Sequence, residues 1–194
     1  MQESVPPGTS SPLEKETVQF TFGGEPAVAV GWVSDKKLFH NQIFTPGRAD
    51  LPQGFTTQLV MESFRVEGWK DVSLFPTLDV REVTPKALEY LSHCTVRLEI
   101  SQADLEAVRS NAVVTKVMYL TNANNSLAAP NNGVTTFDRC ATVSSVELGT
   151  TADPLAIAEQ RGPIVAVFRM SNQSSQKTAN RQVVLKHKSL GSLR

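Results

Sequence analysis

Short apolar stretches that alternate with polar residues recur along most of this chain. Thr17–Phe22 places Val18, Phe20 and Phe22 on one side, and residues 94–100 repeat the pattern with Cys94 on the apolar side. Period-two alternation is typical of strands that bury one face. Turn residues separate stretches of roughly five to eight residues at intervals of about 8–15 positions. This spacing predicts a mainly antiparallel β-sandwich, or a partly open barrel, of about nine to ten short strands.

The remaining strands are expected in segments that lie between clusters of turn residues. Two segments are expected to be loops: Thr45–Gly54, which contains Pro46, Gly47, Pro52 and Gly54, and Thr121–Gly133, which has no periodicity. The expected strands are Ala27–Val33, Leu38–Phe44, Thr56–Val66, Ala112–Leu120, one or two strands within Val134–Leu148, Ile164–Phe168 and Gln182–His187. Val72–Phe75 and Thr77–Val83 are expected as extended chain, with an edge or a bulge at Pro76 between them.

Three short helices are expected to connect strands across the ends of the sandwich. Each has a residue suited to an N-cap, and these caps are Thr84, Ser101 and Asp153. Pro154 suits the first helical position after Asp153, and Gly162 is expected to end that helix. These helices are too short to cover a parallel sheet.

The chain of 194 residues has enough length for one domain with a proper core. We expect a flexible Pro/Ser-rich leader over 1–16, a single β-sandwich-like domain over 17–188 and a tail over 189–194. No run of about 18 apolar residues is present, so no transmembrane segment is predicted. The formal net charge is zero and no basic stripe is interleaved with aromatic residues, so no nucleic-acid partner is predicted.

The two ends of the chain differ in character. Met1 is followed by a Pro/Ser/Gly-rich stretch, which is typical of what remains after an export signal is removed, although an ordinary cytoplasmic N-terminus has the same composition. No acidic residue follows Glu159, so the end of the chain is basic. A basic end suits an anionic surface or partner, and the alternative is a solvated edge strand with a loose tail.

Nothing in the sequence predicts a catalytic centre, a metal site or a cofactor. The three histidines have no metal-binding spacing, and the two cysteines, Cys94 and Cys140, form either one disulfide or two separate buried thiols. Trp69, on a turn after Gly68, is a candidate partner-binding residue, with a lid over the sandwich end as the alternative. Arg161, beside the end of the third helix, is the other candidate.

Three segments together resemble conserved hypothetical proteins of planctomycete bacteria. They are Leu74–Val80 with Thr84–Ala87, Ile100–Leu120, and Asp153–Asn172, which includes "DPLAIAEQRGPIVAVFRMSN". The resemblance covers roughly residues 55–120 and 150–172, and the chain departs from it at Gln160 and in 124–133. It implies export and an envelope setting, and it carries no catalytic residues.

The sequence thus predicts a non-enzymatic extracytoplasmic protein, located in the periplasm, on the envelope or outside the cell. Its expected role is structural or partner-binding, with a protein or a polysaccharide as partner. Two alternatives stay open. One is an enzyme whose site is assembled from dispersed Asp, Glu or His residues, and the other is a periplasmic carrier of small molecules.

Overall fold

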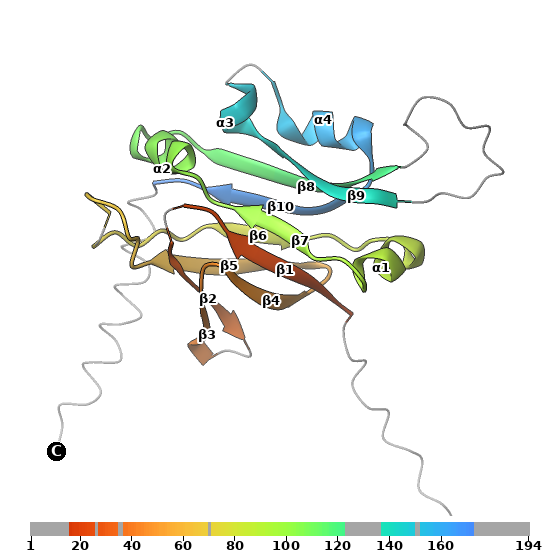
Figure 1. Ribbon diagram of the computed structural model, residues 1–194, viewed down its shortest axis with the longest axis horizontal. Coiled ribbons are helices and arrows are strands. Elements are labelled where there is room, and N and C mark those ends of the chain that lie inside the picture. Colours follow the sequence, from red (N-terminus) through yellow and green to blue (C-terminus); the bar gives the residue numbers. More distant parts are fainter. Residues whose placement is uncertain are drawn as a thin grey trace, which may run out of the picture.

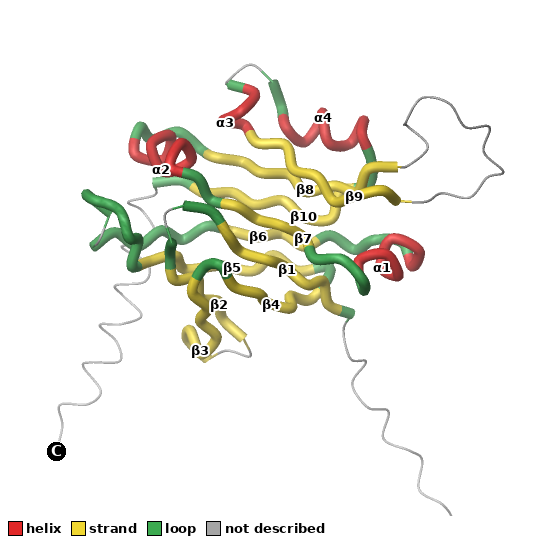
Figure 2. The backbone as a smooth tube through the Cα atoms, in the orientation of Figure 1, coloured by secondary structure: helices red, strands yellow, loops and turns green. Residues whose placement is uncertain are grey.

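The strands form two open sheets that pack face to face (Figure 1). A computed structural model describes residues 16–25, 27–34, 37–69, 71–122, 137–149 and 152–172. These residues contain ten strands and four short helices. The predicted mainly β, sandwich-like architecture is therefore confirmed, and Figure 2 shows how strands dominate both layers.

The smaller sheet has three strands in the order β4-β1-β7. Its central strand β1 (Thr17–Gly23) pairs antiparallel with β4 (Gly47–Pro52) and parallel with β7 (Val96–Glu99). Val18, Phe20 and Phe22 point into the interior, as their alternation predicts.

The larger sheet has seven strands in the order β3-β2-β5-β6-β10-β8-β9, and every described pair in it is antiparallel. Its strands are β2 (Ala29–Ser34), β3 (Lys37–Phe44), β5 (Phe55–Glu62), β6 (Thr77–Val80), β8 (Val114–Asn122), β9 (Phe137–Ser144) and β10 (Ile164–Met170). The strands β7 and β9 each end the order of their sheet, and they run near each other across the sandwich (Figure 1).

Each helix begins at the cap that the sequence predicts, and one further helix is present. The helices are α1 (Pro85–Leu91), α2 (Gln102–Arg109), α3 (Ser145–Leu148) and α4 (Pro154–Arg161). The hydroxyl of Thr84 accepts a hydrogen bond from the amide of Ala87, and the carboxylate of Asp153 accepts one from Leu155. Figure 1 shows α1 and α2 at opposite ends of the sandwich and α4 over the outer face of β8 and β9.

Two apolar clusters hold the layers together. The main core lies between the sheets, and a smaller cluster that includes Val117, Val167 and Ala158 lies beneath α4. Consequently β8 and β10 are buried on both faces, which accounts for their nearly continuous apolar sequences. Gly162 ends α4 against β8, where a Cβ atom would lie 1.8 Å from the carbonyl oxygen of Leu120. Only glycine permits this approach.

Three sequence predictions are wrong in detail. Residues 45–54 are not wholly a loop, because β4 lies within them and buries Ala49 and Leu51 while exposing the residues between. The strand expected over 56–66 ends at Glu62, and a fourth helix, α3, is present where only three were predicted. The described part of residues 134–148 contains one strand, β9, within the one or two expected. Nearly all of the leader 1–16, most of the 121–133 loop, the strand expected over 182–187 and the tail 189–194 lie outside the described residues.

Candidate functional site

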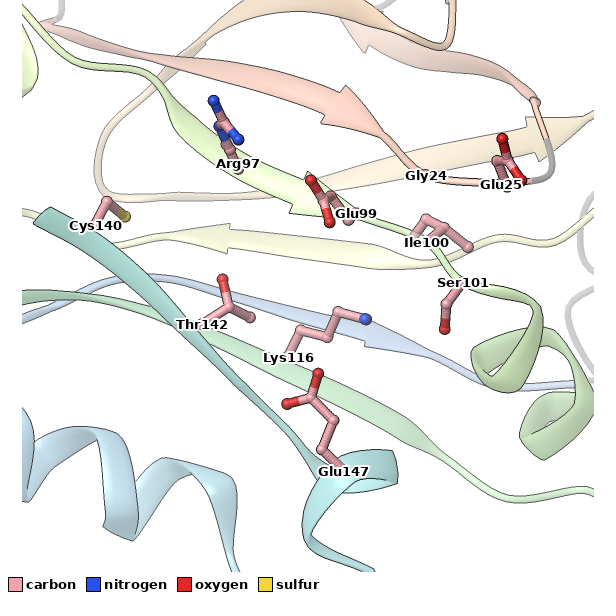
Figure 3. Close-up of a pocket in the computed structure, with 10 residues that line it drawn as sticks. All are labelled: Gly24, Glu25, Arg97, Glu99, Ile100, Ser101, Lys116, Cys140, Thr142 and Glu147. Carbon is pink, nitrogen blue, oxygen red and sulfur yellow. The ribbon is translucent and has the colours of Figure 1, made fainter.

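A recess lies where the edges of the two sheets face each other. This seam cleft, as we call it, has a volume of about 460 Å³. Arg97, Glu99 and Ser101 line one wall, and Cys140, Thr142 and Glu147 line the other. Figure 3 shows β7 and β9 diverging on its two sides, with Lys116 of β8 pointing into the gap between them. The cleft is therefore a wedge between two edge strands rather than a hole inside one sheet.

Lys116 occupies a position at which the other strand residues on the same face are apolar. Its neighbours on that face, Val114, Met118 and Leu120, are fully buried in the main core. Lys116 itself is only 6% exposed, and its Nζ lies 2.8 Å from Oδ2 of Asp104. A buried ammonium needs such a counter-charge, because removal from water without one is costly. The ion pair forms the floor of the cleft.

Asp104 is held in place by the first turn of α2. Ser101 and Asp104 form a capping box, in which the Ser101 hydroxyl accepts from the Asp104 amide at 3.2 Å. In return, Oδ2 of Asp104 accepts from the Ser101 amide at 2.7 Å and from the Ser101 hydroxyl at 2.8 Å. The carboxylate is therefore positioned by two donors besides Lys116, and helix capping and the ion pair depend on the same oxygen.

The rim of the cleft carries more negative than positive charge. Glu25, Glu99 and Glu147 line it and are exposed. Glu99 and Glu147 point into the gap, whereas Arg97 points away from it (Figure 3). Since Asp104 already neutralises Lys116, the rim favours a ligand that brings positive charge.

The backbone on the β7 side of the cleft has hydrogen-bonding groups that no described strand pairs with. The amide of Ile100 donates to the carbonyl of Gly23, and in a parallel ladder alternate residues bond to the same neighbour. Val96 and Leu98 therefore bond to β1, which leaves the N–H and C=O groups of Arg97 and Glu99 facing the cleft.

The β9 side has the same property. The amide of Leu120 donates to Pro163, toward β10, so Tyr119 and Val117 are the residues of β8 that bond to β9. Ala141 and Val143 are their antiparallel partners on β9, so the backbone groups of these two residues are hydrogen-bonded to β8. The N–H and C=O groups of Cys140 and Thr142 thus face the cleft. Within the part of the chain that the structure describes, two strand edges without a neighbouring strand flank it.

The cysteines lie close enough to influence each other but are both free thiols. Burial raises the pKa of Cys140 from 9.0 to about 12, and the nearby Cys94 contributes in the same direction. A thiol with this pKa is protonated at neutral pH, so it is a poor nucleophile. Cys140 therefore contributes a small side chain to the cleft wall rather than a reactive group.

The two partner-binding residues predicted from the sequence lie elsewhere. Trp69 is 6% exposed, its ring lies 5.5 Å from that of Phe64, and the guanidinium of Arg109 lies 5.0 Å above it. This corresponds to the lid alternative, and a side chain so buried offers little surface to a partner. Arg161 is exposed on α4, where its Nη1 donates to the Tyr119 hydroxyl at 3.2 Å. Neither residue lines the cleft.

Sequence reasoning did not select Lys116 or Asp104. Two signals were available: a single lysine on the inner face of an otherwise apolar strand, and an acid three residues after a serine cap. Neither signal shows that the two side chains meet, because β8 and α2 are brought together only by the fold.

The described residues contain no group of three or more His, Cys, Asp and Glu side chains that could hold a metal ion. None of the described helices has the length and apolar character that a membrane crossing requires. No family model matches the chain, and no curated protein or solved structure is similar to it. The geometry of the seam cleft is therefore the basis for inferring a function.

Proposed function

We propose that the protein is a non-enzymatic partner-binding module of the cell envelope, and that it binds an extended protein segment in the seam cleft. The observation that carries this proposal is the pair of unpaired strand edges that flank one cleft. A segment that lies along either edge would gain main-chain hydrogen bonds, as in strand addition to a sheet edge. The resemblance to envelope-associated proteins is the support for the location.

A protein segment suits the cleft better than the polysaccharide that the sequence also allowed. None of the described residues that line the cleft is aromatic, so the flat apolar surface that stacks on a sugar ring is missing there. The cleft instead offers N–H and C=O groups in strand geometry and three exposed carboxylates. Its preferred partner is an extended segment with Lys or Arg side chains.

Lys116 gives the cleft a further point of contact. Its ammonium has three donors, and Asp104 is its one ion-pair partner among the described residues. The side chain points into the gap between the strands (Figure 3). A backbone carbonyl of the bound segment would accept a hydrogen bond from it, and this contact favours a peptide over a purely cationic ligand.

Site-specific crosslinking in native envelopes tests the proposal. A photoreactive residue at Thr142, in the cleft, is compared with one at Glu159, which is exposed on the outer helix α4. We expect protein adducts from position 142 and few from position 159. The adducts should fall when Glu99→Pro removes an N–H that faces the cleft, a substitution that an edge strand tolerates. Equal adducts at both positions, or native protein found free in the cytosol, would contradict the proposal.

A further inference from the structure

The chain carries a segment of its own that fits the seam cleft. Twenty-two residues follow Asn172, and within them residues 181–188 read Arg-Gln-Val-Val-Leu-Lys-His-Lys. Three consecutive residues, Val183 to Leu185, favour extended structure, and the segment has no Asp or Glu. We propose that residues 181–188 dock in the seam cleft of the same chain as an added strand, and that an external partner must displace them.

The described chain ends near the cleft. β10 is antiparallel to β8, and Phe168 pairs with Lys116 while Met170 pairs with Val114. The last described residue, Asn172, is therefore four strand positions from Phe168, and it lies within about 15 Å of the Lys116 backbone if the direction of β10 continues. In Figure 1, β10 ends on the side of the molecule where α2 lies. Ser101, the N-cap residue of α2, lines the cleft.

The intervening chain has sufficient length. Residues 173–180 separate Asn172 from Arg181, and eight residues span up to about 28 Å when extended. This reach exceeds the distance to the cleft. A tether of this length also gives the segment a high effective concentration at the cleft, in the millimolar range for short flexible linkers.

The charge and the residue pattern of the segment also match the cleft. The segment brings Lys186 and Lys188 to a rim on which Glu25, Glu99 and Glu147 are exposed. Val183 and Leu185 fall on the same side of an extended chain, so both can face the interior of the sandwich. Lys186 and Lys188 then face outward, toward the carboxylates of the rim.

The unpaired edges give a reason for docking within one molecule. An exposed strand edge is a template for aggregation, and proteins commonly cover such edges with their own chain. Docking of 181–188 would cover Arg97 and Glu99 on β7, or Cys140 and Thr142 on β9, until a partner arrives. The docking itself is independent of the proposed function, whereas its role in regulating access rests on that function.

Amide hydrogen exchange in the full chain tests the docking. Strand addition should protect alternate amides on the edge that is used, either Arg97 and Glu99 or Cys140 and Thr142. The Leu98 amide, which already bonds to β1, is the internal control. We expect the protected amides to exchange about tenfold faster in the variant Val183→Pro/Val184→Pro/Leu185→Pro, which corresponds to a docked population of about nine-tenths in the unmodified chain.

A second variant and a synthetic peptide complete the test. Lys186→Glu/Lys188→Glu should also raise exchange at the protected edge, and this effect should shrink at high salt because exposed charges are screened. A peptide with the sequence of residues 179–190, added to the proline variant, should restore protection. Equal exchange in the unmodified chain and both variants would overturn the proposal. Protection that grows with protein concentration would also overturn it, since a second copy would then supply the strand.

The outcome can be separated from that of the proposed function. If the exchange pattern is as expected but position 142 captures no foreign protein in either chain, the docking stands and the partner-binding function fails. If position 142 captures a foreign segment equally well in the unmodified chain and the proline variant, partner binding stands, and the claim that a partner must displace residues 181–188 is refuted. Capture that rises in the proline variant supports both.

Discussion

The buried pair of Lys116 and Asp104 can be tested by removing one charge at a time. In Lys116→Met the apolar side chain replaces the lysine stem, but Asp104 loses its cation while its side chain stays 1% exposed. The carboxylate then keeps only the Ser101 amide and hydroxyl as donors. Breaking a buried pair in this way is far more costly than replacing both charges.

The expected loss in the free energy of unfolding follows from the geometry of the ion pair. At 2.8 Å the two charges attract by about 6 kcal/mol at an effective dielectric constant near 20, and the cost of removing both from water offsets much of this energy. Measured losses for such single replacements are about 3–5 kcal/mol. We expect about 3 kcal/mol here, because Ser101 still stabilises the Asp104 carboxylate.

Urea unfolding followed by circular dichroism measures the effect. With a slope near 2 kcal/mol per molar, a loss of about 3 kcal/mol lowers the midpoint by about 1.5 M. The double variant Lys116→Met/Asp104→Asn should be more stable than the sum of the two single losses implies, by about 2 kcal/mol. Arg97→Met, a control on the rim of the same cleft, should change stability by less than about 0.5 kcal/mol. A midpoint for Lys116→Met within 0.3 M (about 0.6 kcal/mol) of the unmodified protein would refute the reasoning.

Three further outcomes are expected. Gly162→Ala should lower the free energy of unfolding by about 2 kcal/mol or more, since the added Cβ would lie 1.8 Å from a backbone oxygen. An unchanged midpoint of thermal unfolding would contradict the close approach. Trp69→Ala should lower the free energy of unfolding by about 3 kcal/mol, because it removes a buried side chain and its cation–π contact with Arg109. A small loss in the variant, or Trp69 fluorescence in the unmodified protein at the wavelength of an indole in water, would contradict this burial. Because the pKa of Cys140 is raised to about 12, the stability this thiol provides is complete below pH 9 and is lost as the pH rises from 9 toward 12. Iodoacetamide should accordingly modify Cys140 far more slowly at pH 9 in the folded than in the unfolded chain, and equal rates would refute its burial.

The alternating segments were the most predictable part of the fold. Thr17–Gly23 is a strand whose alternation places its apolar residues on one face, and the caps at Thr84 and Asp153 determine where two helices begin. Ile164–Met170 is a short, nearly continuous apolar run after a Gly-Pro turn, which is typical of a strand buried on both faces. Local chemistry decides these features, so the sequence is sufficient. The strand β4 was missed because prolines and glycines flank it, although Arg48–Leu51 alternates between exposed and buried residues.

The candidate site was not predictable because its parts are distant in the sequence. Lys116 and Asp104 belong to different elements, and the two edges that flank the cleft come from different sheets. Trp69 illustrates the converse error. A tryptophan on a turn has the local context of an exposed contact residue, but Phe64 and Arg109 enclose it once the chain has folded.

The strand order has a consequence for how the chain reaches its native state. Val80 in the middle of the larger sheet pairs with Ala166, and Phe20 pairs with Val96 in the smaller sheet. A nascent chain cannot complete either layer from its first half, because β6 remains without one neighbour until β10 has been synthesised. Such a high contact order is typical of domains that fold in milliseconds to seconds rather than microseconds. Halves of the chain divided between β6 and α1 should accordingly not fold separately, and each should regain structure only in the presence of the other.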